Sequence, residues 1–282
     1  MILALNTNAT GPAPSFEALL AAAAKYGYGG IDYGIEPALQ LAERTSVRAV
    51  WEQFAKANVQ LAVWGLPVEF RRDEAAFQRG LADLPKKAAF ARELGATRCA
   101  TWIPPTVPDG ESAAHYALVV ARRLRECAAV LGDYGVRFGL EWVGPKTLRA
   151  GKTPFVWTME QVLDLGAATG CSNVGLLVDC WHWYVTGGTQ AQLEALAPEQ
   201  IVHVHINDAP QKPVDEQIDN QRLLPGTTGV IDLGAFFAAL RAVGYAGPVA
   251  VEPFDKSLPA LGFEAAAAKT AAAALPYIQP RT

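Results

Sequence analysis

The segments NVGLLVD (residues 173–179) and IVHVHIND (residues 201–208) decide the fold of this chain. Each is a short apolar run that ends on side chains able to bind a metal. The residues between them are long enough for one crossover helix, which parallel strands require. The pair therefore predicts a strand–helix–strand unit in a parallel sheet that is buried on both faces.

The same alternation of apolar strand and Ala/Leu-rich helix repeats along the chain, with glycines where the helices are expected to end. The expected strands are Ile2–Asn6, Gly30–Tyr33, Gln60–Trp64, Thr97–Thr101, Arg137–Trp142, Val174–Asp179, Ile201–Asn207 and Val249–Glu252. The expected helices are Phe16–Tyr26, Val47–Ala57, Glu74–Leu94, Ala113–Tyr134, Met159–Thr169, Gln190–Leu196, Leu233–Val243 and Gly262–Leu275.

This alternation over 282 residues favours a closed (β/α)₈ TIM barrel of the α/β class, with residues 1–282 as a single domain. A doubly wound open sheet is the structural alternative. Neither a G-x-G-x-x-G fingerprint after the first strand nor a G-x-x-x-x-G-K-[ST] loop occurs, so nucleotide-binding folds lose their main support. Residues 209–229 are long for a connecting loop, and we expect them to fold over the barrel mouth.

The composition indicates a globular protein with a small-molecule ligand. Hydrophobic residues make up 51% of the chain and charged residues 18%, which argues against disorder. The formal net charge of −4 provides no basic surface for a polyanion, so we expect no nucleic-acid partner. No apolar stretch reaches about 18 residues, and the amino terminus has no cationic leader, so we expect no membrane partner and a cytoplasmic location. The cysteines, expected to be reduced core residues, are Cys99, Cys127, Cys171 and Cys180.

Metal-type side chains stand where the later apolar runs end. VRFGLEW (136–142) reaches Glu141, NVGLLVD reaches Asp179, IVHVHIND contains His205, and PVAVEPF (248–254) reaches Glu252. In a barrel the carboxyl ends of the strands share one mouth, and period-two alternation places these four side chains on matching strand faces. Three carboxylates brought together repel one another unless a cation lies between them. We therefore predict one bound divalent metal, with Mn²⁺ as first candidate and Mg²⁺, Co²⁺ or Zn²⁺ as alternatives.

Each of these residues also has a structural interpretation. Asp179 could cap the following helix, and His205 could be a hydrogen-bonded core histidine. A glutamate at a strand end could be a solvated turn residue. His203 lies one layer deeper than His205 on the same strand face, which favours core packing or a supporting role behind the ligands.

Several motifs resemble those of the sugar phosphate isomerase/epimerase superfamily, the xylose isomerase-like barrels that include ketose 3-epimerases. The motifs are LEWVG (140–144), LLVDCWH (176–182), HVHINDA (203–209), RLLPGTTG (222–229) and VEPF (251–254). The resemblance covers nearly the whole chain. It implies that Glu141, Asp179, His205 and Glu252 are metal ligands and that His182 and Arg222 contact the substrate.

The resemblance also implies a reaction. The metal would chelate neighbouring substrate oxygens, and Glu141 and Glu252 would remove and return a proton through a cis-enediolate. We therefore expect a divalent-metal-dependent isomerase or epimerase of a keto-sugar or related polyol. A lyase that dehydrates a keto-inositol or keto-sugar, with His182 as the acid, stays open, as does a non-catalytic metal- or sugar-binding barrel. A three-metal DNA-repair endonuclease needs more than the 4 histidines present.

One position departs from the ketose 3-epimerases. They commonly carry a second glutamate six residues after the first, whereas this chain has Thr147. The basic residues beside it, Lys146, Arg149 and Lys152, could recognise a carboxylate or phosphate of the substrate, or could belong to a solvated loop.

Five of the 7 tryptophans fall at or just past strand ends. Trp102, Trp142 and Trp183 are predicted to stack on the carbon face of a carbohydrate substrate, although aromatic residues also simply fill barrel mouths. Assembly into a homodimer or homotetramer is an open expectation from fold analogy.

Overall fold

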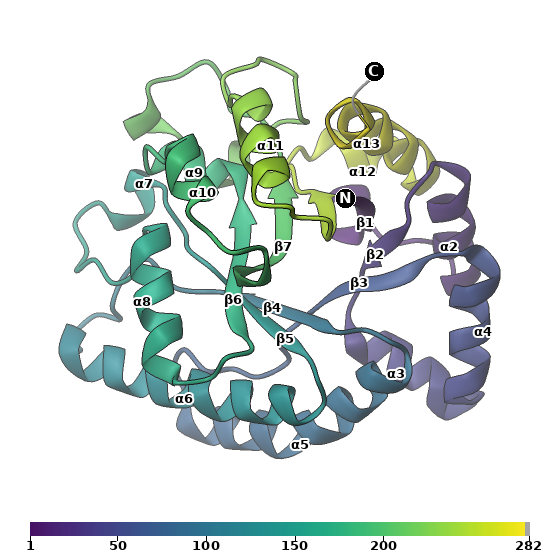
Figure 1. Ribbon diagram of the computed structural model, residues 1–282, viewed down its shortest axis with the longest axis horizontal. Coiled ribbons are helices and arrows are strands. Elements are labelled where there is room, and N and C mark those ends of the chain that lie inside the picture. The colour runs from purple at the N-terminus through teal and green to yellow at the C-terminus, as the bar shows by residue number, and fades with distance from the viewer. Residues whose placement is uncertain (280–282) are drawn as a thin grey trace.

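Parallel strands close into a barrel in which every strand pairs with its neighbours in sequence order and the last pairs with the first (Figure 1). The computed structural model describes residues 1–279. Its strands are β1 (Ile2–Asn6), β2 (Gly30–Asp32), β3 (Gln60–Gly65), β4 (Arg98–Trp102), β5 (Arg137–Glu141), β6 (Val174–Asp179), β7 (Ile201–Ile206) and β8 (Pro248–Val251). The predicted (β/α)₈ barrel is confirmed, and the open sheet is excluded because β8 pairs with β1.

Helices surround the barrel as an outer layer (Figure 1). The longer ones are α2 (Phe16–Lys25), α3 (Ile35–Arg44), α4 (Val47–Ala57), α5 (Glu74–Glu93), α6 (Ala113–Asp133), α8 (Met159–Thr169), α11 (Leu233–Ala242) and α13 (Phe263–Ile278). The shorter ones are α1 (Thr7–Thr10), α7 (Lys146–Arg149), α9 (Cys180–Val185), α10 (Gln190–Glu194), α12 (Ser257–Ala260), η1 (Pro198–Gln200), η2 (Val214–Glu216) and η3 (Asp219–Gln221). Helix α13 packs beside β1, so the last helix lies next to the first strand.

Helix α3 is the longest element that the sequence pattern did not predict. Pro37 interrupts its apolar pattern, but this residue falls in the first turn, where the backbone N–H groups have no partner within the helix. Ile35 and Ala38 are fully buried, so tertiary packing stabilises the helix.

The strands of the barrel carry apolar side chains on both of their faces, one towards the helices and one towards the barrel interior. The main apolar core lies between strands and helices and includes Phe138, Leu140 and Trp142 of the β5 region. Two small clusters are separate from it: Ala4, Ala62 and Ala250 form one, and Val63, Ala100 and Leu177 the other. Each cluster joins residues of two adjacent strands with a residue of a strand that is not paired to either, so we place both clusters in the barrel interior.

The segment 209–229 folds over the barrel mouth, as predicted. Asp208 begins it and pairs through its backbone with Leu223. The Asp208 carboxylate accepts hydrogen bonds from the backbone N–H groups of Thr228 and Gly229, each at 2.8 Å. These contacts close the segment on itself and carry Arg222 to the ends of β6 and β8.

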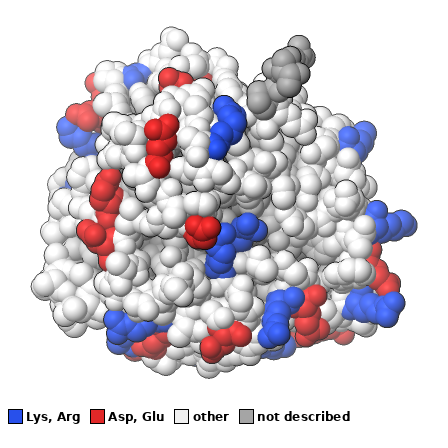
Figure 2. Space-filling view, viewed as in Figure 1, with Lys and Arg blue, Asp and Glu red and all other residues white. Residues whose placement is uncertain are grey.

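The surface and the cysteines agree with a folded single domain. All four cysteines are free, and three of them are buried, whereas Cys171 is partly exposed. Acidic and basic side chains are interspersed on the face that Figure 2 shows, with no large basic patch in that view. Among the described residues, no helix combines the length and hydropathy needed to cross a membrane. The absence of a nucleic-acid partner stays a prediction.

Candidate metal centre

Four side chains from consecutive strands meet at the carboxyl end of the barrel. Glu141 and Asp179 end β5 and β6, His205 is the penultimate residue of β7, and Glu252 directly follows β8. One ligand-type atom of each residue lies within 4.8 Å of the corresponding atoms of the other three. The structure therefore brings together all four residues that the sequence pattern selected, because strand alternation turns them towards the barrel axis.

The cluster contains polar atoms that no protein group satisfies. His205 Nδ1 lies 3.2 Å from Glu252 Oε2 and 3.9 Å from Glu141 Oε1. Within the described residues 1–279, the buried atoms His205 Nδ1 and Glu141 Oε1 have no hydrogen-bond partner. A buried polar atom left unpaired costs about 1–3 kcal/mol, so native proteins rarely tolerate two side by side. Three carboxylates and one imidazole are a suitable donor set for a divalent cation, and the residues present fit such an ion.

The pKa shifts within the cluster also indicate a site for a cation. Burial, and then the charges of Glu252 and Asp179, raise the pKa of Glu141 well above its usual range. Burial also raises the pKa of Asp179. Burial disfavours a charged imidazole, but the carboxylates, Glu252 foremost, outweigh it and raise the pKa of His205. Crowded, buried carboxylates of this kind are stabilised when a cation lies among them.

Arg222 reaches this cluster from the mouth segment. Its Nη1 donates to Asp179 Oδ2 at 2.6 Å and to Glu252 Oε2 at 2.8 Å. Only 3% of the residue is exposed. Although burial alone would lower the pKa of Arg222, Asp179 and Glu252 raise it, so the guanidinium stays charged. Arg222 therefore already neutralises part of the carboxylate charge.

His182 lies in α9, the short helix that Asp179 caps by accepting a hydrogen bond from the N–H of Trp181 at 2.7 Å. Asp179 thus has both the capping role and the place in the cluster that the sequence left as alternatives. The Gly144 N–H donates to His182 Nδ1 at 3.1 Å, and the guanidinium Nη2 of Arg222, which can also only donate, lies 3.1 Å from His182 Nε2. This Nε2 lies 3.7 Å from Glu141 Oε1. Burial, and then the charge of Arg222, lower the pKa of His182 well below its usual range, so the ring is neutral and each of its nitrogens lies against a protein donor.

The three tryptophans predicted to bind substrate lie in different places. Trp102 pairs with Glu141 in the β4–β5 register and is 47% exposed. The guanidinium of Arg71 stacks on its ring at 4.1 Å and holds the indole in one orientation. Trp142 is fully buried, because the alternation that turns Glu141 inward turns the next residue towards the helices. Trp183 is also buried, and both rings line a small hollow beside α8 rather than the carboxylate cluster.

The basic stretch after β5 contacts protein groups. Lys146 is exposed and pairs with Asp215 in the mouth segment. Arg149 donates to the carbonyl oxygen of Gly144, and its guanidinium lies 3.8 Å from the Trp157 ring centroid. Thr147 Oγ1 donates to the Gln217 carbonyl at 2.9 Å. Lys146 and Thr147 thus join the stretch to the mouth segment, and Arg149 packs against Gly144 and Trp157. Both sets of contacts support the structural interpretation of these basic residues.

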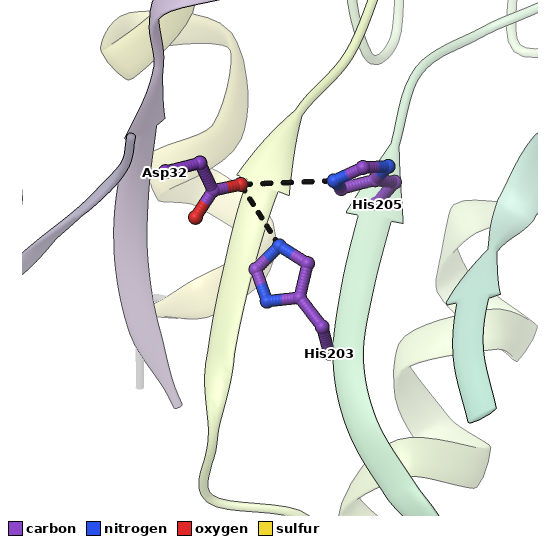
Figure 3. Close-up of side chains that lie close together, drawn as sticks. All are labelled: Asp32, His203 and His205. Atoms are coloured by element: carbon purple, nitrogen blue, oxygen red, sulfur yellow. Dashed lines mark hydrogen bonds and ion pairs between the residues drawn. The ribbon is translucent and has the colours of Figure 1, made fainter. Parts of the chain in front are cut away.

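Sequence reasoning overlooked Asp32. This residue ends β2, and its Oδ2 lies 2.9 Å from His203 Nε2 and 3.6 Å from His205 Nε2 (Figure 3). His203 therefore has a specific partner, in keeping with the supporting role considered for it. The signal was present, because the GGIDYG strand (29–34) ends on a carboxylate just as the later strands do.

A cavity of about 550 Å³ opens near the carboxyl ends of β1 and β2. Its lining includes Thr7 and Asn8 after β1, Phe16 of α2, and Tyr33, the residue after Asp32. It therefore lies at the same end of the barrel as the carboxylate cluster.

Comparison with known proteins identifies related sequences. A family model described as a xylose isomerase-like TIM barrel matches residues 20–278. An inosose isomerase of Bacillus velezensis is 34% identical over 134 residues, which are 48% of this chain and 45% of that protein. A 3-dehydroshikimate dehydratase of Pseudomonas aeruginosa is 33% identical over 167 residues, which are 57% of this chain and 24% of that protein. The matched segments thus span less than half the length of these curated relatives.

Solved structures extend the similarity to the whole chain. A xylose isomerase domain protein from Alicyclobacillus acidocaldarius subsp. acidocaldarius is 34% identical, with a TM-score of 0.88 over 99% of this chain and 98% of that one. The IOLI protein, whose structure contains a bound zinc atom, is 23% identical, with a TM-score of 0.82 over 99% of this chain and 98% of that one. At that identity the second likeness shows the fold alone.

Proposed function

This chain belongs to the xylose isomerase-like TIM barrel family, and on that premise we propose that it is a divalent-metal-dependent isomerase or epimerase of a keto-polyol, an inosose or a keto-sugar. The observation that carries the proposal is the convergence of Glu141, Asp179, His205 and Glu252 within 4.8 Å. The similarity to inosose isomerases supports a cyclic keto-polyol as the first substrate class to test.

Glu141, Asp179, His205 and Glu252 would hold the ion. When bound, a divalent cation supplies Lewis acidity, which polarises a substrate carbonyl and makes the hydrogen on the neighbouring carbon acidic. The preference for Mn²⁺ stays a prediction. The zinc atom of the IOLI structure supports testing Zn²⁺ beside Mn²⁺, Mg²⁺ and Co²⁺.

The two glutamates would handle the proton. Glu141 and Glu252 come from β5 and β8, three strands apart around the barrel, so their carboxylates approach the space between them from different directions. One carboxylate would remove the proton from the substrate carbon, and the other would return one. Return to the opposite face of the same carbon gives an epimer, and return to the neighbouring carbon gives an isomer.

The remaining residues would orient the substrate. His182 Nε2 lies 3.7 Å from Glu141 Oε1 and 3.1 Å from Arg222 Nη2, so the ring would orient the substrate together with this guanidinium. Arg222 holds the carboxylates of Asp179 and Glu252 in place and would stabilise negative charge on an enediolate oxygen. Arg71 covers one face of Trp102, and the exposed part of that indole would contact substrate carbons.

A dehydratase is the second candidate, favoured by the similarity to 3-dehydroshikimate dehydratases. Proton removal beside a carbonyl is common to both reactions, but dehydration also needs an acid that protonates the departing hydroxyl. Burial lowers the pKa of His182 and keeps its ring neutral, and a neutral imidazole is a weak acid. For this reason we rank isomerisation first.

The test uses protein stripped with a chelator and then reloaded separately with Mn²⁺, Mg²⁺, Co²⁺ or Zn²⁺. Each form is incubated in D₂O with inososes, ketoses and 3-dehydroshikimate, and the products are analysed by NMR and mass spectrometry. We expect deuterium beside the carbonyl of a keto-polyol, no loss of water, and no exchange in stripped protein. Loss of one water would favour the dehydratase, and ligand binding without exchange would favour a non-catalytic barrel. Full activity in metal-free protein would refute the metal site.

A further inference from the structure

The two ring nitrogens of His205 face different carboxylates. His205 Nδ1 lies 3.2 Å from Glu252 Oε2, inside the candidate metal centre. His205 Nε2 lies 3.6 Å from Asp32 Oδ2, outside that centre. In Figure 3 the Asp32 carboxylate points towards both histidine rings, and dashed lines join it to each. Asp32 thus lies on the Nε2 side of the His205 ring, whereas the carboxylates of the candidate metal centre lie on its Nδ1 side.

This arrangement determines which tautomer of His205 can bind a metal ion in the candidate centre. A neutral imidazole carries its proton on one nitrogen and a lone pair on the other, and a metal binds the lone pair. Because Nδ1 faces Glu141 and Glu252, His205 can join them as a ligand only when the proton is on Nε2. His205 is 7% exposed, so this N–H needs an acceptor within the protein. Asp32 Oδ2 lies 3.6 Å from Nε2, just beyond hydrogen-bond distance, and pairs with it as the carboxylate on this side of the ring.

His203 holds the acceptor in place. Its Nε2 shares a 2.9 Å hydrogen bond with Asp32 Oδ2, and its ring packs edge-on against His205, with the ring centroids 4.9 Å apart. His203 is fully buried and Asp32 is 8% exposed. Strand β2 pairs with β1 and β3 rather than with β7, so the contact runs across the barrel interior. The contact between Asp32 and the two histidines is therefore made by side chains and not by hydrogen bonds between paired strands.

We propose that Asp32 is a positioning residue for the metal centre: it accepts the Nε2–H of His205, so that Nδ1 offers its lone pair to the ion, while His203 keeps the carboxylate in place. Carboxylates behind metal-bound histidines commonly orient the ring and select its tautomer. The proposal rests on the metal site of the proposed function, and it assigns roles to two residues outside the ligand set.

A second reading of the same cluster competes with this one. Asp32, His203 and His205 also present ligand-type atoms within 4.8 Å of one another, as a small cation site would. A second ion there would need His205 to bind two metals through its two nitrogens at once. The arrangement with Asp32 as acceptor needs only the proton that the His205 ring already carries, and we favour it for that reason.

The test measures metal affinity and tautomer rather than turnover. Asp32→Asn removes the charge with little change of volume, and His203→Gln removes the second contact to Asp32 while leaving Asp32 itself. We expect the Kd for Mn²⁺ and Zn²⁺, measured by calorimetry and chelator competition, to rise about 10–100-fold in Asp32→Asn. We expect a smaller rise in His203→Gln. In ¹⁵N-histidine NMR spectra of metal-free protein, recorded at a pH high enough to make the His205 ring neutral, the Nε2–H form should dominate in the wild type and lose population in Asp32→Asn.

Glu74→Gln is the matched control. Glu74 pairs with buried Arg123 at 2.6 Å, and it lies on α5 rather than at a strand end. This substitution also neutralises a carboxylate paired with a buried side chain, so it should lower Tm while leaving the metal Kd and the His205 tautomer unchanged.

The outcomes separate this inference from the proposed function. A wild type that binds one ion per chain, with Kd and tautomer unchanged in Asp32→Asn, overturns the role of Asp32 and leaves the metal centre standing. Two ions per wild-type chain, one of them lost in Asp32→Asn, would make Asp32 a ligand and also overturn it. A wild type that binds no ion overturns both proposals.

Discussion

Replacing Arg222 should destabilise the metal-free protein strongly and the metal-loaded protein less. The guanidinium is 3% exposed and donates to Asp179 Oδ2 at 2.6 Å, to Glu252 Oε2 at 2.8 Å and to Asp219 Oδ1 at 2.8 Å. Arg222→Gln removes the positive charge and leaves two buried carboxylates uncompensated. Removing one partner of a buried ion pair costs about 3–5 kcal/mol. At about 2–4 °C per kcal/mol for a domain of this size, Tm should fall by roughly 6–20 °C.

A divalent ion supplies positive charge to the same carboxylates, so the loss should be smaller after loading with metal. By linkage, each ~1.4 kcal/mol of stability that metal restores corresponds to about tenfold tighter binding in the variant. The assay is therefore thermal unfolding of stripped and loaded protein, paired with metal calorimetry at the same pH. The two measurements must agree through this relation.

Arg123→Gln is the control for Arg222→Gln. Arg123 is 4% exposed and pairs with Glu74 rather than with the carboxylates of the cluster. Its replacement should destabilise stripped and loaded protein equally. Two results would refute the idea that Arg222 and the metal neutralise the same carboxylates, Asp179 and Glu252. One is a decrease of less than about 1 kcal/mol in the free energy of unfolding of metal-free Arg222→Gln. The other is an equally large decrease in the metal-loaded variant.

Three further predictions follow from the site and its surroundings. Glu141→Gln and Glu252→Gln should each lower the rate of deuterium exchange about 10³-fold and weaken metal binding, and near-normal exchange in either would reject its role in proton transfer. Trp102→Ala should raise KM with the metal Kd unchanged, because the indole lies at the mouth but outside the ligand set; an unchanged KM would count against the stacking role. Hydrogen bonds from Gln78 and then Arg123 lower the pKa of Glu74 to about 2, so its stabilising contribution is present above the ordinary value of 4.5 and is lost as pH falls from there towards 2. The Tm difference between wild type and Glu74→Gln should shrink over that range, and a constant difference would contradict the assignment.

The sequence alone determined the barrel and the members of the candidate metal centre. Both depend on local patterns: apolar strands alternate with helices, and the strands leading to Glu141, Asp179, His205 and Glu252 end on metal-type side chains. Alternation along a strand is a property of the backbone, so it predicts which residues share the inner face before any contact is known. The same rule, applied to the residue after Glu141, would have placed Trp142 against the helices.

Only the tertiary structure decided which side chains support those residues. Asp32 and His203 are 171 positions apart and meet across the barrel interior, where no pairing of adjacent strands brings them together. Arg222 reaches Asp179 and Glu252 because the segment after β7 closes on itself through Asp208. Such contacts depend on the register of the closed barrel and on the path of a long loop. A local sequence pattern contains no information on barrel register or loop path. The candidate metal ligands could therefore be predicted from the sequence, whereas the residues that hold them in place became visible only in the folded structure.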